Sequence, residues 1–157
     1  MKKLLYIILI ISPLTLVGQR QASNWYFGQG SGLNFNTEPP TVLTNGSLYT
    51  FEGCATISDK KGQLLFYTDG ITVYNKNHTV MSNGRDLNGH NSSTHSALIV
   101  PKPGNPNIYF IFTVDAWGDP KGLQYSIVDM TLDGGLGRIT NEKNVILYTP
   151  TVEKVAA

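Results

Sequence analysis

The three histidines are the side chains best suited to hold a metal ion. His90 and His95 lie five residues apart in a polar loop, and His78 lies upstream. Zinc needs three or four converging ligands, whereas a five-residue spacing on a loop imposes no common face. No nearby cysteine or carboxylate completes the set. We therefore expect loop histidines that form hydrogen bonds, and no metal site.

Two pairs of aspartates have spacings that merit a chemical test. Asp69 and Asp115 occupy matching positions in two similar segments, and paired carboxylates can perform acid–base work on glycosidic bonds. Each nevertheless follows a β-rich run and precedes a turn, where aspartate caps backbone amides. Asp129 and Asp133 precede two glycines but lack the alternating acidic pattern and terminal glutamate of a calcium loop. Capping is the role we expect for all four.

The remaining reactive residue types also lack their partners. Ser92, Ser93 and Ser96 lie near a histidine, but no G-x-S-x-G elbow is present. The glycine-rich segment 28–32 lacks the lysine and following helix of a P-loop and is typical of a hairpin turn. Cys54, the one cysteine, lies in an apolar run that favours a buried thiol. We predict no catalytic residue and no cofactor.

Trp117 is the one candidate ligand-binding residue. It lies in a polar loop, residues 115–120, where an exposed indole can stack on a sugar ring or contact a protein partner. The same side chain could instead pack over the edge of a sheet. Both roles remain open from the sequence.

The N-terminal residues have the order of a secretory signal peptide. Lys2 and Lys3 precede an apolar run from residue 4 to 11, and a second apolar patch ends before Gly18 and the polar residues that follow. The run is shorter than a membrane span and Pro13 interrupts it. We predict a signal peptide over residues 1–18, cleavage near Gly18, and no stable membrane anchor in the mature protein.

The near-neutral net charge argues against partners that are attracted by a strongly charged protein surface, such as nucleic acid. The chain carries a net charge of +1, and removal of residues 1–18 takes away two lysines to leave about −1. Such a chain exerts no long-range attraction on nucleic acid. Charged residues are few at 15% while glycine is plentiful, as suits short strands joined by many turns. We expect no nucleic-acid partner and an extracellular or cell-surface protein.

Short β-rich runs separated by turn formers fill the chain after residue 20. The predicted strands cover residues 25–27, 33–35, 41–43, 54–58, 64–68, 71–74, 79–81, 97–100, 108–114, 123–130, 145–148 and 152–156. LFYTD at 65–69 matches IFTVD at 111–115, and each follows an apolar strand and a turn. The repeating units therefore begin near Cys54, Ala97 and Val155, about 43 and 58 residues apart.

This repeat predicts an all-β, incomplete β-propeller with four-stranded antiparallel blades of the WD40-like type. Residues 19–50 would give three strands of the closing blade, 51–94 blade 1, 95–151 blade 2, and 152–157 the start of blade 3. About three blades are thus present, and since a propeller closes with four to eight, the sequence reads as a fragment. A self-contained β-sandwich is the alternative that suits the length.

Five strings in the sequence resemble one family. NWYFG at 24–28, EGCATISD at 52–59, LFYTDG at 65–70, VPKPG at 100–104 and VDMTLDGG at 128–135 are similar to the N-terminal propeller of large secreted Bacteroidetes proteins. Those proteins often carry PKD-like modules and end in a gliding-motility-associated, type B sorting domain for type IX secretion. The resemblance covers nearly all of residues 24–157 and implies a secreted surface protein, with no family catalytic residues to carry over.

We therefore expect a non-enzymatic propeller module for binding, adhesion or display, with an extracellular glycan or protein as its partner. The alternative is a propeller-fold extracellular enzyme that acts on glycans or uses a quinone cofactor, because fold does not fix function.

Overall fold

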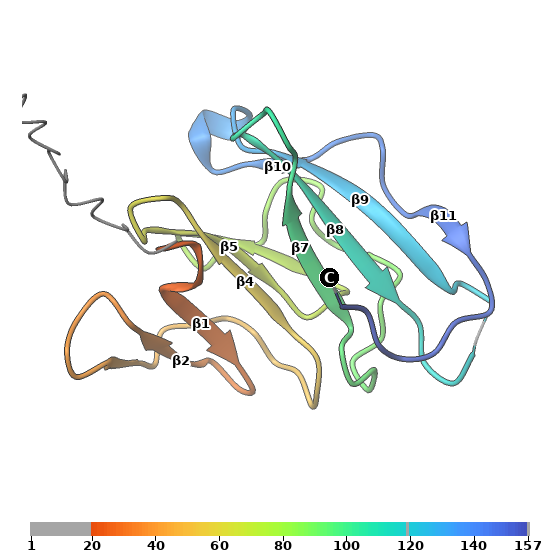
Figure 1. The fold of residues 1–157 in the computed structure, drawn as a ribbon, viewed down its shortest axis with the longest axis horizontal. Helices are drawn as coiled ribbons and strands as arrows, with labels where there is room; N and C mark the ends of the chain where they lie inside the picture. The colour runs from red at the N-terminus through yellow and green to blue at the C-terminus, as the bar shows by residue number, and fades with distance from the viewer. Residues whose placement is uncertain (1–19, 119, 157) are drawn as a thin grey trace, which may run out of the picture.

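The computed structural model describes residues 20–118 and 120–156, and the predicted signal peptide lies outside these residues. The described chain is all-β, as expected (Figure 1). The strands are β1 (Asn24–Phe27), β2 (Ser31–Asn34), β3 (Thr41–Leu43), β4 (Ala55–Ser58), β5 (Leu64–Thr68), β6 (Val73–Asn75), β7 (Ala97–Pro101), β8 (Ile108–Val114), β9 (Leu123–Asp129), β10 (Arg138–Ile139) and β11 (Val145–Tyr148). Two short 3-10 turns, η1 (Arg20–Ala22) and η2 (Asp133–Gly135), complete the described elements.

The strands form three separate antiparallel sheets in chain order. Sheet I has the order β1-β2-β3, and sheet II has the order β4-β5-β6. Glycines permit the β1–β2 turn, because Gly28 and Gly30 both have a positive φ that other residues seldom adopt. The predicted hairpin at residues 28–32 is therefore confirmed.

Sheet III is the largest sheet. Strands β7, β8 and β9 form a meander, and β10 and β11 pair with opposite ends of the free edge of β9. Between them, Ile127 exchanges backbone hydrogen bonds with Thr140 and Glu142. Strands β10 and β11 thus act together as one interrupted edge strand along β9, so the five strands of sheet III occupy four positions across the sheet.

The sheets pack against one another in succession. Strand β1 lies beside β4 and β4 lies beside β7, so the first strand of each sheet adjoins the first strand of the next (Figure 1). The larger core fills the space between sheets II and III. Its buried residues are Ile57, Phe66, Val73, Met81, Leu87, Ala97, Tyr109, Ile111, Val128, Met130 and Ile139.

A smaller, aromatic core joins sheets I and II. The Tyr67 ring is fully buried and stacks between those of Tyr26 and Tyr74, with centroid distances of 4.6 and 5.3 Å. Leu48 completes the buried cluster. Burial of these rings is the main favourable term that holds sheet I on sheet II.

Two predicted strands are wrong. Residues 152–156 form no strand, because one parallel bridge between His95 and Lys154 replaces a ladder. Residues 79–81 contribute only an isolated bridge from Val80 to Tyr74. There the Asn75 side chain accepts hydrogen bonds from the backbone amides of Asn77 and Thr79, which closes a tight turn and redirects the chain after a single pair. Sheet II consequently has three strands, not four.

Candidate binding surfaces

The loop after β8 presents Trp117 to solvent. Its side chain is 74% exposed, and its backbone has a φ of +53°, which is uncommon for a bulky residue. The Trp117 amide donates a 2.8 Å hydrogen bond to Oε1 of Glu153, whose own carbonyl accepts a hydrogen bond from His95. Glu153 therefore ties the loop to the residue at the entrance of β7.

A hollow of about 570 Å³ lies beside the indole. Its lining residues are Thr94, Trp117, Gly118, Thr151, Val152, Glu153 and Lys154. The Oγ1 atom of Thr151 is buried there without a hydrogen-bond partner in the described chain. The His90 ring packs on the indole at a centroid distance of 5.4 Å. Trp117 thus combines an exposed aromatic surface with a neighbouring hollow.

The three histidines lie in different surroundings. His78 faces sheet I, His95 is an exposed residue before β7, and Nδ1 of His90 accepts a hydrogen bond from the Ser92 amide. In the described residues, no group of three or more His, Cys, Asp or Glu side chains is placed to share a metal ion. The structure therefore does not bring the sequence candidates together.

His78 belongs to the interface between sheets I and II. Oδ1 of Asn45 accepts the Tyr26 hydroxyl, so Nδ2 of Asn45 faces Nε2 of His78 at 2.8 Å. That contact needs an unprotonated Nε2, which leaves the ring proton on Nδ1, 3.1 Å from the Tyr67 hydroxyl. Desolvation by burial lowers the pKa of His78 and favours this neutral ring.

Three of the four candidate aspartates cap turns, whereas Asp133 forms no side-chain hydrogen bond among the described residues, so its predicted capping role is wrong. Oδ1 of Asp69 accepts the amides of Ile71 and Thr72 at 2.8 and 2.7 Å, and Oδ1 of Asp115 accepts the Ala116 amide. Oδ1 of Asp129 accepts the amide and the hydroxyl of Thr131, hydrogen bonds that lower the pKa of this carboxyl. These three carboxylates therefore have the backbone-capping role predicted from their positions.

The other candidates for chemistry are engaged in packing. Ser93 and Ser96 are buried, and their hydroxyls donate to the carbonyls of Val114 and Asp69. Cys54 is half-buried against the aromatic core, and burial raises the pKa of its thiol, with a smaller effect from Asp69. A raised pKa disfavours the thiolate that a nucleophile requires.

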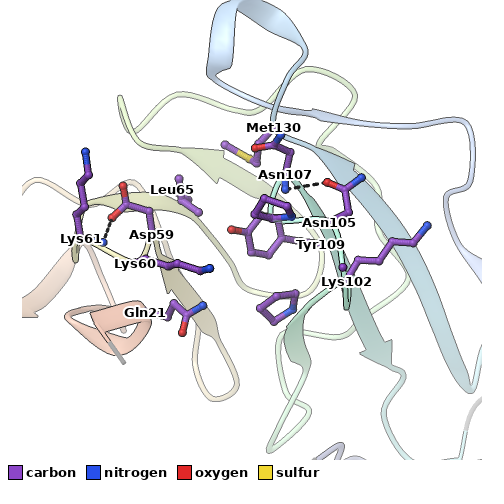
Figure 2. A pocket seen from close by; sticks show the side chains of 13 residues that line it. Gln21, Asp59, Lys60, Lys61, Leu65, Lys102, Asn105, Asn107, Tyr109 and Met130 are labelled. Atoms are coloured by element: carbon purple, nitrogen blue, oxygen red, sulfur yellow. Dashed lines mark hydrogen bonds between the residues drawn. The ribbon is translucent and has the colours of Figure 1, made fainter. Parts of the chain in front are cut away.

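The structure also reveals a groove that was not predicted. It lies at the other end of sheets II and III, between the β4–β5 turn and the β7–β8 turn, and has a volume of about 790 Å³ (Figure 2). Leu65, Tyr109 and Met130 give it an apolar floor. Its polar lining includes Gln21, Asp59, Lys60, Lys61, Lys102, Asn105 and Asn107.

The sequence contained one signal of this groove. Both turns were identified from their Asp, Gly, Pro and Asn residues, and lysines lie in or beside both of them, at positions 60, 61 and 102. Their proximity depends on how sheet II packs on sheet III, which no local pattern specifies.

Comparisons with known proteins return no match: no family model, curated protein or solved structure matches this chain. No helix among the described residues is long and apolar enough to cross a membrane.

Proposed function

We propose that this chain is part of a secreted or cell-surface β-propeller that binds an extracellular glycan or protein and performs no catalysis. The observation that carries the proposal is Trp117, an exposed indole beside a hollow, whose backbone amide donates a hydrogen bond to Glu153. Aromatic side chains in this situation contact sugar rings and protein partners at little conformational cost.

The succession of sheets supports the propeller part of the proposal. In a propeller, the innermost strands of consecutive blades are neighbours around a central axis. Strands β1, β4 and β7 have this relationship, and apolar cores fill the spaces between their sheets. A β-sandwich would instead close its core between two facing sheets.

The outer faces of the first and last sheets support it further. On sheet I, Trp25, Phe35 and Val42 are exposed, and the rings of Trp25 and Phe35 are in contact. On sheet III, Phe110, Phe112 and Tyr125 form an aromatic cluster on the face opposite the buried Ile111. Apolar side chains gathered on one face call for cover, and further blades on both sides would supply it.

The turn-capping role of the repeated aspartates favours binding over catalysis. Asp69 and Asp115 direct a carboxylate oxygen to backbone amides, so the repeat position has a structural use in both sheets. A general acid or base instead needs a carboxylate within reach of a substrate proton. The backbone contacts of Asp69 and Asp115 therefore support a structural role for them over acid–base catalysis.

The experiment is a binding screen of purified protein against extracellular polysaccharides and cell-envelope proteins. We expect Trp117→Ala to weaken the binding of a ligand found in this way by about tenfold, as for a typical binding hot spot. Trp117→Phe, which keeps an aromatic face, should retain most of the affinity. Undiminished binding by Trp117→Ala would remove Trp117 from the binding surface.

A further inference from the structure

The groove between sheets II and III lies far from the Trp117 hollow. Lys102 and residues 104–107 line it just before β8 begins at Ile108, whereas Trp117 follows the end of β8 at Val114. A seven-residue strand rises about 20 Å between its ends, so a ligand in the groove does not touch Trp117.

The charge of the groove is positive. Three lysines and one aspartate line it, a local excess of two positive charges in a chain whose net charge is +1. Within the described residues, none of the ammonium groups of Lys60, Lys61 and Lys102 takes part in a hydrogen bond or an ion pair. Oδ1 of Asp59 accepts the amides of Lys61 and Gln63, so this oxygen is committed to its own turn.

Two polar groups point into the centre of the groove from opposite walls. Figure 2 shows the Lys60 ammonium directed from the β4–β5 turn toward β8, and the Tyr109 hydroxyl directed back from β8. Tyr109 is only 5% exposed, and its hydroxyl has no hydrogen-bond partner among the described residues. Burial, with a contribution from Asp59, raises the pKa of Tyr109, so the hydroxyl keeps its proton and remains a donor.

Amide side chains surround these two groups. Gln21 lies below Lys60 in the view of Figure 2, and Asn105 and Asn107 lie beside Tyr109, where Oδ1 of Asn105 accepts the Asn107 amide. Carboxamides donate and accept hydrogen bonds at once, which matches the hydroxyl groups of sugars. The walls are turns and offer no open strand to which the backbone of a peptide could add.

We propose that this groove binds an acidic oligosaccharide, a chain of sugars that carry carboxylates. The Lys60 ammonium and the Tyr109 hydroxyl donate to one carboxylate, the amides contact ring hydroxyls, and Leu65 and Met130 contact the C–H faces of the ring. Lys61 and Lys102 flank the groove on either side, where they attract the carboxylates of neighbouring sugars (Figure 2). This inference rests on the proposed binding function only in its choice of an extracellular glycan.

The test measures binding of an oligogalacturonate of four to six units to the purified protein by calorimetry at low salt. We expect saturable binding that weakens steeply as salt rises. Lys60→Ala should weaken it about tenfold and Tyr109→Phe about threefold, since each removes one donor and Phe preserves the packed ring. Lys76→Ala removes an exposed lysine from a turn outside the groove and should change nothing beyond the general charge effect.

Asp59→Asn should change the affinity for the oligogalacturonate in the opposite direction. It keeps Oδ1 for the turn and removes a negative charge from the groove, so the oligogalacturonate should bind more tightly. A Trp117→Ala variant should bind it normally, whereas Lys60→Ala should leave binding at Trp117 intact. The experiment therefore distinguishes a wrong assignment of the groove from a wrong assignment of ligand binding to Trp117.

Three outcomes would overturn the inference. One is the absence of oligogalacturonate binding, and another is equal binding of its fully methyl-esterified form, which lacks the charge. The third is tighter binding of a hexaglutamate peptide, which would make the groove a site for acidic peptides.

Discussion

At the residue scale, the partly buried ring of His78 makes a contribution to stability that depends on pH. Its neutral form accepts a hydrogen bond at Nε2 from Asn45 and lies against the rings of Tyr26 and Tyr67. Because desolvation lowers its pKa in the folded protein, the unfolded chain binds the proton first as pH falls below the ordinary value of 6.5. The stabilisation is therefore fully present above pH 6.5 and declines as pH falls toward the folded-state pKa.

We accordingly predict that the free energy of unfolding is lower at pH 5.5 than at pH 7.5, and that His78→Gln reduces this difference. His95→Gln, at an exposed position, should retain it. Chemical denaturation of the three proteins at both pH values is the measurement. An equal pH dependence in His78→Gln would show that another group is responsible.

Asp69 tests the structural interpretation of the repeated aspartates at the same scale. Asp69→Ala leaves the Ile71 and Thr72 amides without their acceptor and should cost about 1–2 kcal/mol of stability. Asp69→Asn retains an oxygen in the same place and should cost much less. Thermal unfolding of both variants decides the matter, and an Asp69→Ala protein as stable as wild type would leave the repeated position unexplained.

At the scale of elements, Tyr67 is the contact by which strand β5 holds sheet I. Its ring stacks on Tyr26 of β1, and its hydroxyl oxygen accepts the Ser47 amide from the segment after β3. Tyr67→Phe keeps the stacking but leaves that amide without its partner, a loss of about 1–3 kcal/mol. Tyr67→Ala also opens a cavity and should cost about 3–5 kcal/mol.

The Tyr67→Phe substitution should destabilise one part of the structure more than the rest. Because Tyr67 lies in the smaller core, hydrogen exchange in Tyr67→Phe should accelerate in β1, β2 and β3 and change little in β8 and β9. Uniform acceleration through all three sheets would show that the two cores unfold as one unit.

At the scale of the whole molecule, the two end sheets each carry apolar side chains on their outer face. The outer face of sheet I includes exposed Trp25 and Val42, and that of sheet III includes the cluster around Phe112. We predict that a protein consisting of the described residues self-associates through these faces in a concentration-dependent way. Light scattering after size-exclusion chromatography measures this directly.

Charged substitutions separate this effect from general insolubility. Val42→Lys and Phe112→Lys together should shift the protein toward the monomer, whereas Thr131→Lys, on an exposed turn, should not. A wild-type protein that stays monomeric at high concentration would contradict the proposal that further blades cover both faces.

The sequence by itself determined the local elements. Short β-rich runs between Gly, Asn, Asp and Pro turns were enough to place β3, β5, β8 and β11 with the observed bounds, because strand propensity and turn chemistry are local properties. The capping roles of Asp69 and Asp115 followed from the same logic. The strands predicted at 79–81 and 152–156 failed because a strand needs a partner, and local propensity does not say whether a partner is present.

Only the tertiary structure decided which surfaces the elements form. The exposure of Trp117 depends on Glu153, which lies 36 residues further along the chain. The lysine groove depends on the packing of sheet II against sheet III, which brings Lys60 opposite Tyr109. Both features result from long-range packing. The burial of apolar side chains decides which segments become neighbours, and the secondary-structure propensity of a single segment does not.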